Sequence, residues 1–234
     1  MRVFAGPNGS GKTSLYSVIS KTYTFGIFIN ADEIEKIIQT KGLIDLFEFG
    51  LNVTTKDLEI FNSLNDSQSL FDKAKQESYT IDSIVAENFI VNKPKKTNSY
   101  EAAFTAAFIR YLRVKQQKSF SYETVKSNNS KLRELETAKK IGFKTRLYFI
   151  CTDDCKKNSH RVKLKVAKGG HNVDADKIRK RYFKTLENTA DVIKTVDRAF
   201  LFDNSGKKMN LLAEVYQGKA FKFYTENLPF WFEE

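Results

Sequence analysis

The sequence contains only two cysteines, Cys151 and Cys155, among its 234 residues. Two thiols cannot form a disulfide framework, and so low a content is typical of a protein from a reducing compartment. With His160 and His171 they could in principle form a zinc site, but the histidine spacing does not fit a zinc finger. The cysteines therefore favour neither disulfides nor a structural metal.

Long apolar runs are also missing. No stretch approaches the roughly 20 consecutive apolar residues that a membrane-spanning helix needs, and the first apolar segment begins at residue 2, too early for a signal peptide to precede it. We therefore expect a cytoplasmic protein without a membrane partner. The length is sufficient for one domain with a sizeable core, and neither repeats nor low-complexity tracts are evident.

Acidic residues are too few to balance the basic ones. The chain has 39 Lys and Arg against 28 Asp and Glu, which gives a formal net charge of +11. Residues 156–184 alone hold eleven Lys or Arg and two acidic residues. This charge could stabilise phosphoryl groups, form a solvated helix face, or bind RNA. Because the excess is local, we favour the first interpretation and do not expect a nucleic-acid partner.

Residues 6–13 read Gly-Pro-Asn-Gly-Ser-Gly-Lys-Thr, the pattern of a phosphate-binding P-loop. Glycines allow backbone N–H groups to approach a phosphate, the lysine adds a cation, and the hydroxyl of Thr13 is a ligand for Mg²⁺. The loop follows an apolar run and precedes a helical pattern, which is the order that the motif requires. We expect ATP and Mg²⁺ to bind at Gly6, Pro7, Asn8, Gly9, Ser10, Gly11, Lys12, Thr13 and Ser14.

Apolar, β-rich segments alternate with helical patterns along the chain. Strands are expected at residues 3–5, 25–30, 120–123, 146–151 and 199–203, with helices between them. This alternation predicts an α/β fold of the P-loop NTPase type, with a mainly parallel sheet, helices on both faces and ligand groups at the carboxyl ends of the strands.

We expect a P-loop domain over residues 1–206 that contains a helical insert over about 42–117. Amphipathic helices are expected within the insert at 57–77, 81–90 and 100–114, with a loop at 93–96. The sequence does not decide whether the insert narrows a substrate pocket, contacts a macromolecule or only adds packed surface. The basic segment, residues 153–184, is expected to form a lid, and the aromatic tail, residues 207–234, a small ribbon packed on the domain.

Several short blocks together resemble the zeta-toxin family of P-loop kinases, which is also described as zeta-toxin-like proteins and UDP-N-acetylglucosamine kinases. The blocks are residues 5–13, Asn30-Ala31-Asp32, residues 119–124, the Arg161 to Tyr182 segment with Gly169-Gly170-His171, and Phe202-Asp203-Asn204-Ser205. They occur in the family's order and cover residues 1–40 and about 100–206. The resemblance implies a kinase-like P-loop fold and an ATP-dependent kinase.

Asp32 matches the family residue that takes a proton from the acceptor sugar hydroxyl. A carboxylate after the second strand is a plausible group for this role, because phosphoryl transfer needs the nucleophile to be positioned. The alternative is that Asp32 caps a helix beginning at Glu33.

Glu123 matches a family glutamate implicated in acceptor binding. It could accept hydrogen bonds from sugar hydroxyls or order the waters of Mg²⁺, and the alternative is a solvated strand end. Thr124 also agrees with the family and is expected to contact substrate.

Arg161 and Arg181 match lid positions where the family places arginines that contact phosphate, although Arg179 is a competitor for the role of Arg181. A guanidinium group is permanently charged and fits phosphate oxygens. Gly169 and Gly170 would let the lid bend, and His171 is expected to contact the substrate phosphate or cap the following helix. The alternative is that His171 is a structural histidine with no contact to substrate.

The sequence thus favours a kinase that transfers the γ-phosphate of MgATP to a nucleotide-sugar hydroxyl, with Asp32, Lys12, Arg161 and Arg181 as catalytic residues. The resemblance implies UDP-N-acetylglucosamine as acceptor and leaves open a toxin role with an antitoxin partner. The alternatives are a P-loop kinase for another metabolite and a P-loop protein in which ATP regulates binding to nucleic acid or protein.

Overall fold

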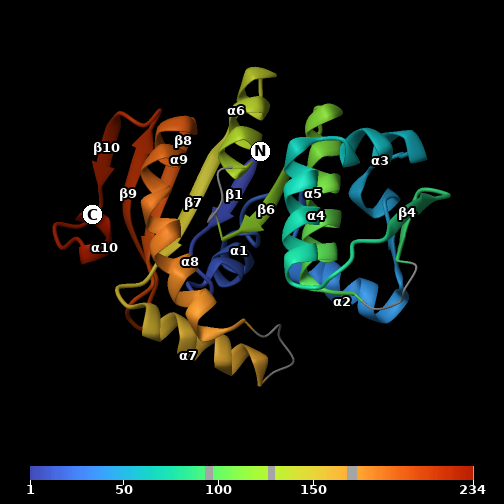
Figure 1. Ribbon diagram of the computed structural model, residues 1–234. Coiled ribbons are helices and arrows are strands. Elements are labelled where there is room, and N and C mark those ends of the chain that lie inside the picture. Colours follow the sequence, from blue (N-terminus) through green and yellow to red (C-terminus); the bar gives the residue numbers. More distant parts are fainter. Residues whose placement is uncertain (93–96, 126–129, 168–172, 234) are drawn as a thin grey trace. The chain divides into compact units, whose positions relative to one another are not determined.

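The computed structural model describes residues 1–92, 97–125, 130–167 and 173–233 (Figure 1). The chain divides into two compact units, which are described in turn: residues 1–26 with 121–234, and residues 27–120. None of the helices in the described ranges has the length and apolar character that crossing a membrane requires.

A mainly parallel sheet forms the centre of the first unit. Its strands lie in the order β10-β9-β8-β7-β1-β6. Parallel pairs join β6 to β1, β1 to β7 and β7 to β8, whereas β9 and β10 pair antiparallel at the edge. The strands are β1 (Arg2–Ala5), β6 (Phe120–Thr124), β7 (Arg146–Cys151), β8 (Arg198–Asp203), β9 (Asn210–Tyr216) and β10 (Ala220–Phe223).

A ladder of aromatic rings sets the register of three neighbouring strands. Phe4 of β1 stacks on Tyr148 of β7 at a centroid distance of 4.8 Å, and Tyr148 stacks on Phe200 of β8 at 4.9 Å. These residues are also direct partners in the strand pairing. A slip by one residue would move a ring to the other face of the sheet. The ladder therefore fixes the register, so that the carboxyl ends of β1, β7 and β8 lie at the same edge of the sheet.

Helices connect the parallel strands, as the crossover between parallel strands requires. In Figure 1, α6, α8 and α9 lie in front of the strands, and α9 contacts both α6 and α8. Asp154 caps α7 by accepting from the N–H of Lys156, and Asp174 caps α8 in the same way. The helices are α1 (Lys12–Ile19), α6 (Ser130–Lys140), α7 (Cys155–Val166), α8 (Ala175–Glu187), α9 (Thr189–Thr195) and α10 (Phe230–Glu233).

The aromatic tail is a ribbon of β9 and β10 followed by α10. Trp231 is buried, lies 5.8 Å from the ring of Phe149, and donates from Nε1 to the Asp203 carboxylate at 3.1 Å. By contrast, Phe221 and Phe223 of β10 are half exposed. One end of the tail is therefore anchored on the sheet, while the edge strand faces solvent.

The second unit combines helices with a small sheet of its own. Helix α2 packs on α5, and the antiparallel sheet has the order β3-β5-β4. Asn98 caps α5, and Thr54 with Asp57 forms a capping box at α3. The elements are β2 (Ile27–Ile29), α2 (Ala31–Lys41), β3 (Leu43–Asp45), the 3₁₀ helix η1 (Phe47–Phe49), α3 (Thr55–Asn62), α4 (Asn65–Gln76), β4 (Ser83–Ala86), β5 (Phe89–Asn92) and α5 (Ser99–Lys115).

The helix predicted over residues 81–90 is wrong, because this segment forms the hairpin of β4 and β5. Glu87 and Asn88 form its turn with φ of 48° and 66°, the left-handed conformation that two-residue hairpins favour. The buried side chain of Asn88 accepts from the N–H of Val53 and donates to the C=O of Leu51. These contacts hold the turn.

The stretch predicted over 57–77 is two helices, and the loop predicted at 93–96 lies outside the described residues.

We expect Asn88→Ala to lower the free energy of unfolding by about 2–4 kcal/mol, because it removes two buried hydrogen bonds and places alanine in the left-handed region. Asn88→Gly should cost less, since glycine tolerates this conformation. Urea denaturation measures both, and Glu87→Gly at the neighbouring turn position is the control, expected to be close to wild type. Wild-type stability of Asn88→Ala would show that the hairpin does not depend on this side chain.

Candidate functional site

The predicted phosphate-binding loop connects β1 to α1 in the first unit. Lys12 begins α1, and Gly11 directly before it has a φ of 105°. Gly6 and Gly9 have φ values of 149° and 74°. All three glycines thus occupy the region that other residues rarely adopt. The strand, loop and helix follow one another as the motif predicts.

Each of these glycines also lies against a different segment of the first unit. A Cβ atom on Gly6 would overlap the C=O of Ile150 in β7, and one on Gly9 would lie 2.5 Å from the C=O of Asn158 in α7. A Cβ on Gly11 would overlap the side-chain amide of Asn204, which follows β8. The glycines are therefore required by close packing as well as by backbone conformation.

Lys12 and Thr13 converge on one carboxylate. The Thr13 hydroxyl donates to Oε2 of Glu123 at 2.8 Å, and Nζ of Lys12 lies 3.7 Å from Oε1 of the same residue. Nζ of Lys12, which is buried, also donates to the C=O of Gly6 at 3.1 Å and of Pro7 at 2.9 Å. Because β6 runs parallel to β1, Glu123 lies at the strand end beside the loop.

Arg161 of the predicted lid is connected to the loop through one residue. Its Nη2 donates to the C=O of Asn204 at 2.9 Å, and the side-chain amide of Asn204 donates to the C=O of Ser10 at 2.8 Å. The backbone N–H of Asn204 in turn donates to the C=O of Cys151 at the end of β7. This chain of contacts holds α7, the end of β8 and the loop together.

Buried polar atoms gather around the loop without a hydrogen-bond partner in the described part of the protein. They are Oδ1 of Asn8, Oγ of Ser10, Nδ2 of Asn158 and Nη1 of Arg161. An unsatisfied buried donor costs about 1–3 kcal/mol, and such atoms call for an explanation. Donors on Asn158 and Arg161, close to a lysine and a glycine loop, fit the oxygens of a phosphate chain. The residues present therefore fit a nucleotide.

The remaining predicted residues of the first unit lie in three places. Ser14 is exposed on α1, and Thr124 is half buried beside Glu123, opposite Ala5 in the strand pairing. On α8, Arg179 is exposed whereas Arg181 is half buried, which favours Arg181 of the two as the residue that faces the protein. The buried Tyr182 holds α8 by donating to the C=O of Thr152 at 2.6 Å.

Two predicted residues are not brought to this site by the described structure. Asp32 belongs to the second unit, and His171, with Gly169 and Gly170, lies outside the described residues. The alternative that Asp32 caps its helix is wrong, because α2 begins at Ala31 and the side chain of Asn30 is the cap, accepting from the N–H of Asp32 at 2.8 Å. Asp32 lies within the first turn instead.

Two residues that sequence reasoning gave no role are part of the site. Asn158 packs its backbone against Gly9, and its side chain accepts from the hydroxyl of Thr152. Asn204 connects Arg161 to the loop. The block that includes Asn204 was visible in the sequence, but its contact with a loop almost 200 residues earlier was not. Asn158 lies on a basic helix whose pattern shows no sign of a buried amide.

Comparisons with known proteins bear on the fold. No family model matches the sequence. An uncharacterised protein of Haemophilus influenzae is 32% identical over 82 residues, which are 35% of this chain and 59% of that protein. Two crystal structures of the AvrRxo1-ORF1:AvrRxo1-ORF2 complex match 95% of this chain at 14% identity, with a TM-score of 0.58 for the complex with ATP and 0.55 for the complex with sulphate ions.

The chain spans only 60% of the matched chain in each AvrRxo1 complex. A chain of the PezAT toxin-antitoxin system of Streptococcus pneumoniae matches 89% of this chain and 71% of its own length at 13% identity, but the TM-score of 0.43 is too low to support an argument. The AvrRxo1 likeness and the parallel sheet with its loop between β1 and α1 confirm the predicted fold class. The chain has a P-loop kinase-like fold, as the resemblance to zeta toxins implies.

We expect Gly9→Ala to lower the free energy of unfolding by about 2 kcal/mol or more, because the new methyl group would overlap the backbone of α7. Gly142→Ala is the matched control: Gly142 has a φ of 93°, but a Cβ there meets nothing within 4 Å, so its cost of about 1 kcal/mol comes from conformation alone. Thermal denaturation compares the two. Equal losses would show that α7 does not pack on the loop.

Proposed function

We propose that this protein is an ATP-dependent kinase of the zeta-toxin type, which transfers the γ-phosphate of MgATP to a hydroxyl of a small molecule. The observation that carries the proposal is the convergence of Lys12, Thr13 and Glu123 beside a glycine loop whose neighbours include unpartnered buried donors. This arrangement has a cation for phosphate oxygens, a hydroxyl and carboxylate for a metal, and backbone N–H groups at the start of a helix.

Lys12 would move from the C=O groups of Gly6 and Pro7 to the phosphates when ATP binds. An ammonium group loses little by this exchange, because a phosphate oxygen is a charged acceptor and forms the stronger hydrogen bond. The contacts within the loop keep Lys12 buried and close to the place where it is needed.

The hydrogen bond between Thr13 and Glu123 favours one of the two roles considered for Glu123. A carboxylate that accepts from the P-loop hydroxyl could order the waters of a metal ion, if the same hydroxyl were a ligand of that ion. Mg²⁺, when bound, supplies charge neutralisation for the β- and γ-phosphate oxygens. We therefore assign Glu123 to the metal side of the site, with Thr124 beside it toward the acceptor.

Arg161 and Arg181 would stabilise the negative charge of the phosphoryl group. Arg161 supports this role directly, since Nη2 is held by Asn204 while the buried Nη1 has no partner among the described residues. A guanidinium oriented through one nitrogen and open at another suits a phosphate oxygen. Arg181 and His171 complete the lid in this proposal.

In the transfer, the acceptor oxygen forms a bond to the γ-phosphorus and the bond from that phosphorus to the β-bridging oxygen breaks, so ADP leaves. Asp32 would accept the proton of the acceptor hydroxyl.

The acceptor implied by the zeta-toxin resemblance is a nucleotide sugar, UDP-N-acetylglucosamine. Each AvrRxo1 structure is a complex of two proteins, and one of these structures also contains ATP. These observations support ATP and a possible antitoxin as partners of this chain.

We expect Lys12→Ala to abolish ATP binding, because it removes the cation of the loop, whereas Asp32→Asn should keep binding and lose at least about 100-fold in transfer. Incubation with MgATP and a panel of nucleotide sugars, followed by mass spectrometry of the products, measures transfer. Calorimetry measures binding.

Glu33→Gln is the matched control on the same turn of α2, since Glu33 is paired with Lys36 at 2.9 Å and should not affect transfer. Undiminished transfer by Asp32→Asn would remove Asp32 from the mechanism. ATP binding without phosphorylation of any nucleotide sugar would refute this acceptor class, and failure of the wild-type protein to bind ATP would refute the kinase.

A further inference from the structure

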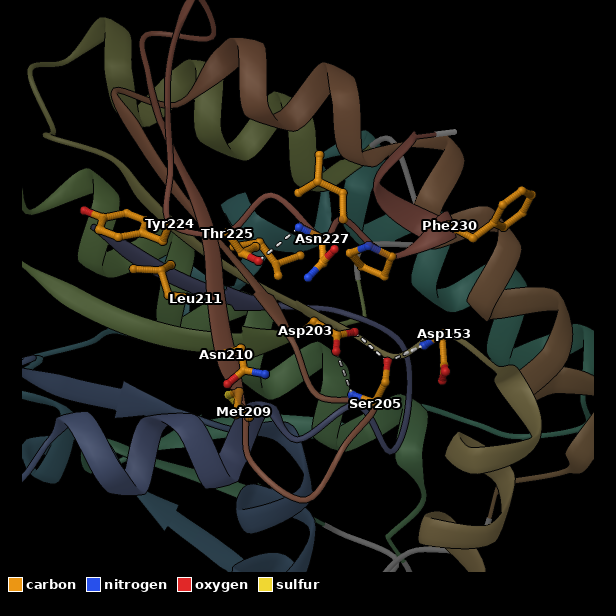
Figure 2. Close-up of a pocket in the computed structure, with 13 residues that line it drawn as sticks. Asp153, Asp203, Ser205, Met209, Asn210, Leu211, Tyr224, Thr225, Asn227 and Phe230 are labelled. Atoms are coloured by element: carbon orange, nitrogen blue, oxygen red, sulfur yellow. Dashed lines mark hydrogen bonds between the residues drawn. The ribbon is translucent and has the colours of Figure 1, made fainter.

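The turn that follows β8 is held in place by contacts that do not involve the phosphate-binding loop. The Asp203 carboxylate accepts from the N–H of Ser205 at 3.2 Å, from the hydroxyl of Ser205, and from Nε1 of Trp231 at 3.1 Å. The Ser205 hydroxyl accepts from the N–H of Asp153 at 2.8 Å. These residues line one side of the pocket drawn in Figure 2, where dashed lines join Ser205 to both aspartates. The turn is therefore anchored to the end of β7.

Asn204 lies at the centre of this anchored turn. Its N–H donates to the C=O of Cys151 at 2.8 Å, and Nζ of Lys157 in α7 donates to the C=O of Ser205 at 3.2 Å. The backbone of Asn204 is thus fixed by contacts of its own and of its neighbours. Its side-chain amide and its C=O contact two further segments, which are the loop and Arg161.

The side-chain amide of Asn204 holds one peptide unit of the loop. Its Nδ2 donates to the C=O of Ser10 at 2.8 Å. In a planar trans peptide the C=O of one residue and the N–H of the next point in opposite directions, so a fixed carbonyl on Ser10 also fixes the N–H of Gly11. That N–H makes no hydrogen bond within the described part of the chain and lies at the start of α1, where backbone N–H groups bind anions.

This peptide unit depends on an external contact for its orientation. Gly11 has a φ of 105° and no Cβ, so the backbone at this point has more conformational freedom than at other residues. The first hydrogen bond of α1 runs from the N–H of Leu15 to the C=O of Gly11, and the helix therefore does not hold the C=O of Ser10. A hydrogen bond to that C=O also polarises the peptide, which makes the N–H of Gly11 a stronger donor.

The C=O of Asn204 orients the arginine of the predicted lid. It accepts from Nη2 of Arg161 at 2.9 Å, while the buried Nη1 has no partner among the described residues. Because a guanidinium is planar and rigid, a contact at one nitrogen limits the directions of the other. A single anchored residue thus contacts both the loop and the cation of α7.

We infer that Asn204 is a positioning residue of the proposed kinase. Its side-chain amide directs the N–H of Gly11 toward the phosphates of ATP, and its C=O holds the guanidinium of Arg161 in register with that donor. Asn204 itself does not touch the substrate. The inference rests on the proposed function and deepens it, because it names the residue that sets the loop and the lid relative to one another.

Asn204→Asp tests the side-chain contact, because a carboxylate has the shape of the amide but lacks a donor for the C=O of Ser10. A hydrogen bond to a charged group is lost when the N–H of Gly11 turns away, so we expect ATP to bind about tenfold or more weakly. Asn204→Ala introduces no charge and should weaken binding in the same direction. Calorimetry well below the unfolding temperature measures both variants.

Asn88→Ala is the matched control. The amide of Asn88 also donates to a backbone C=O, that of Leu51, but it lies in the hairpin of the second unit. This variant should lose stability and still bind ATP as the wild-type protein does. A general loss of stability is thereby separated from a loss of loop orientation.

The NMR signal of the Gly11 amide gives a readout that a purely structural role would not move. On addition of MgATP we expect its proton to shift downfield in the wild-type protein and in Asn88→Ala, because the N–H donates to a phosphate oxygen. Saturating MgATP should not produce this shift in Asn204→Asp or Asn204→Ala.

Wild-type affinity for ATP in both Asn204 variants would overturn the inference and leave the kinase proposal in place. Weaker binding with the shift of Gly11 retained would overturn it as well, since Asn204 would then act without directing this N–H. If the wild-type protein does not bind ATP, the proposed function fails, and this inference fails with it.

Discussion

The close packing of three glycines is the constraint on which the site depends. Gly6, Gly9 and Gly11 lie against β7, α7 and the segment after β8, and at none of the three positions is there space for a side chain. The loop is thereby held by β7 and α7, which follow one another in the chain, and by the segment after β8, all of them far from the loop in sequence. This packing fixes the directions of the backbone N–H groups before a ligand arrives, which is the preorganisation that phosphate binding needs.

The same packing explains why buried polar atoms gather at the loop. Because α7 lies directly on Gly9, the side chains of Asn158 and Arg161 are removed from water, and some of their donors lack partners in the described structure. Burying these donors without partners costs free energy of folding, and hydrogen bonds to a phosphate chain would offset that cost. On one side of the loop the carboxylate of Glu123 accepts from the hydroxyl of Thr13.

The sequence predicted most accurately those features that depend on residues close together in the chain. The P-loop and the strands at 146–151 and 199–203 could be recognised because apolar runs and motif spacing are local signals. The pattern over residues 81–90 predicts a helix because Ile81, Ile84 and Val85 also fit a helical period, but this segment forms the hairpin of β4 and β5. The decisive contacts of Asn88, with Leu51 and Val53, are distant in sequence. For the same reason the link from Arg161 through Asn204 to Ser10 could not be foreseen.

The most direct test of the central claim is a crystal structure of the protein with Mg²⁺ and a non-hydrolysable ATP analogue. The account predicts that Nζ of Lys12 leaves the C=O groups of Gly6 and Pro7 for a phosphate oxygen, with the Thr13 hydroxyl and the Glu123 carboxylate both facing the metal and its waters. An analogue bound elsewhere, with the contacts of Lys12 to its own loop unchanged, would contradict it.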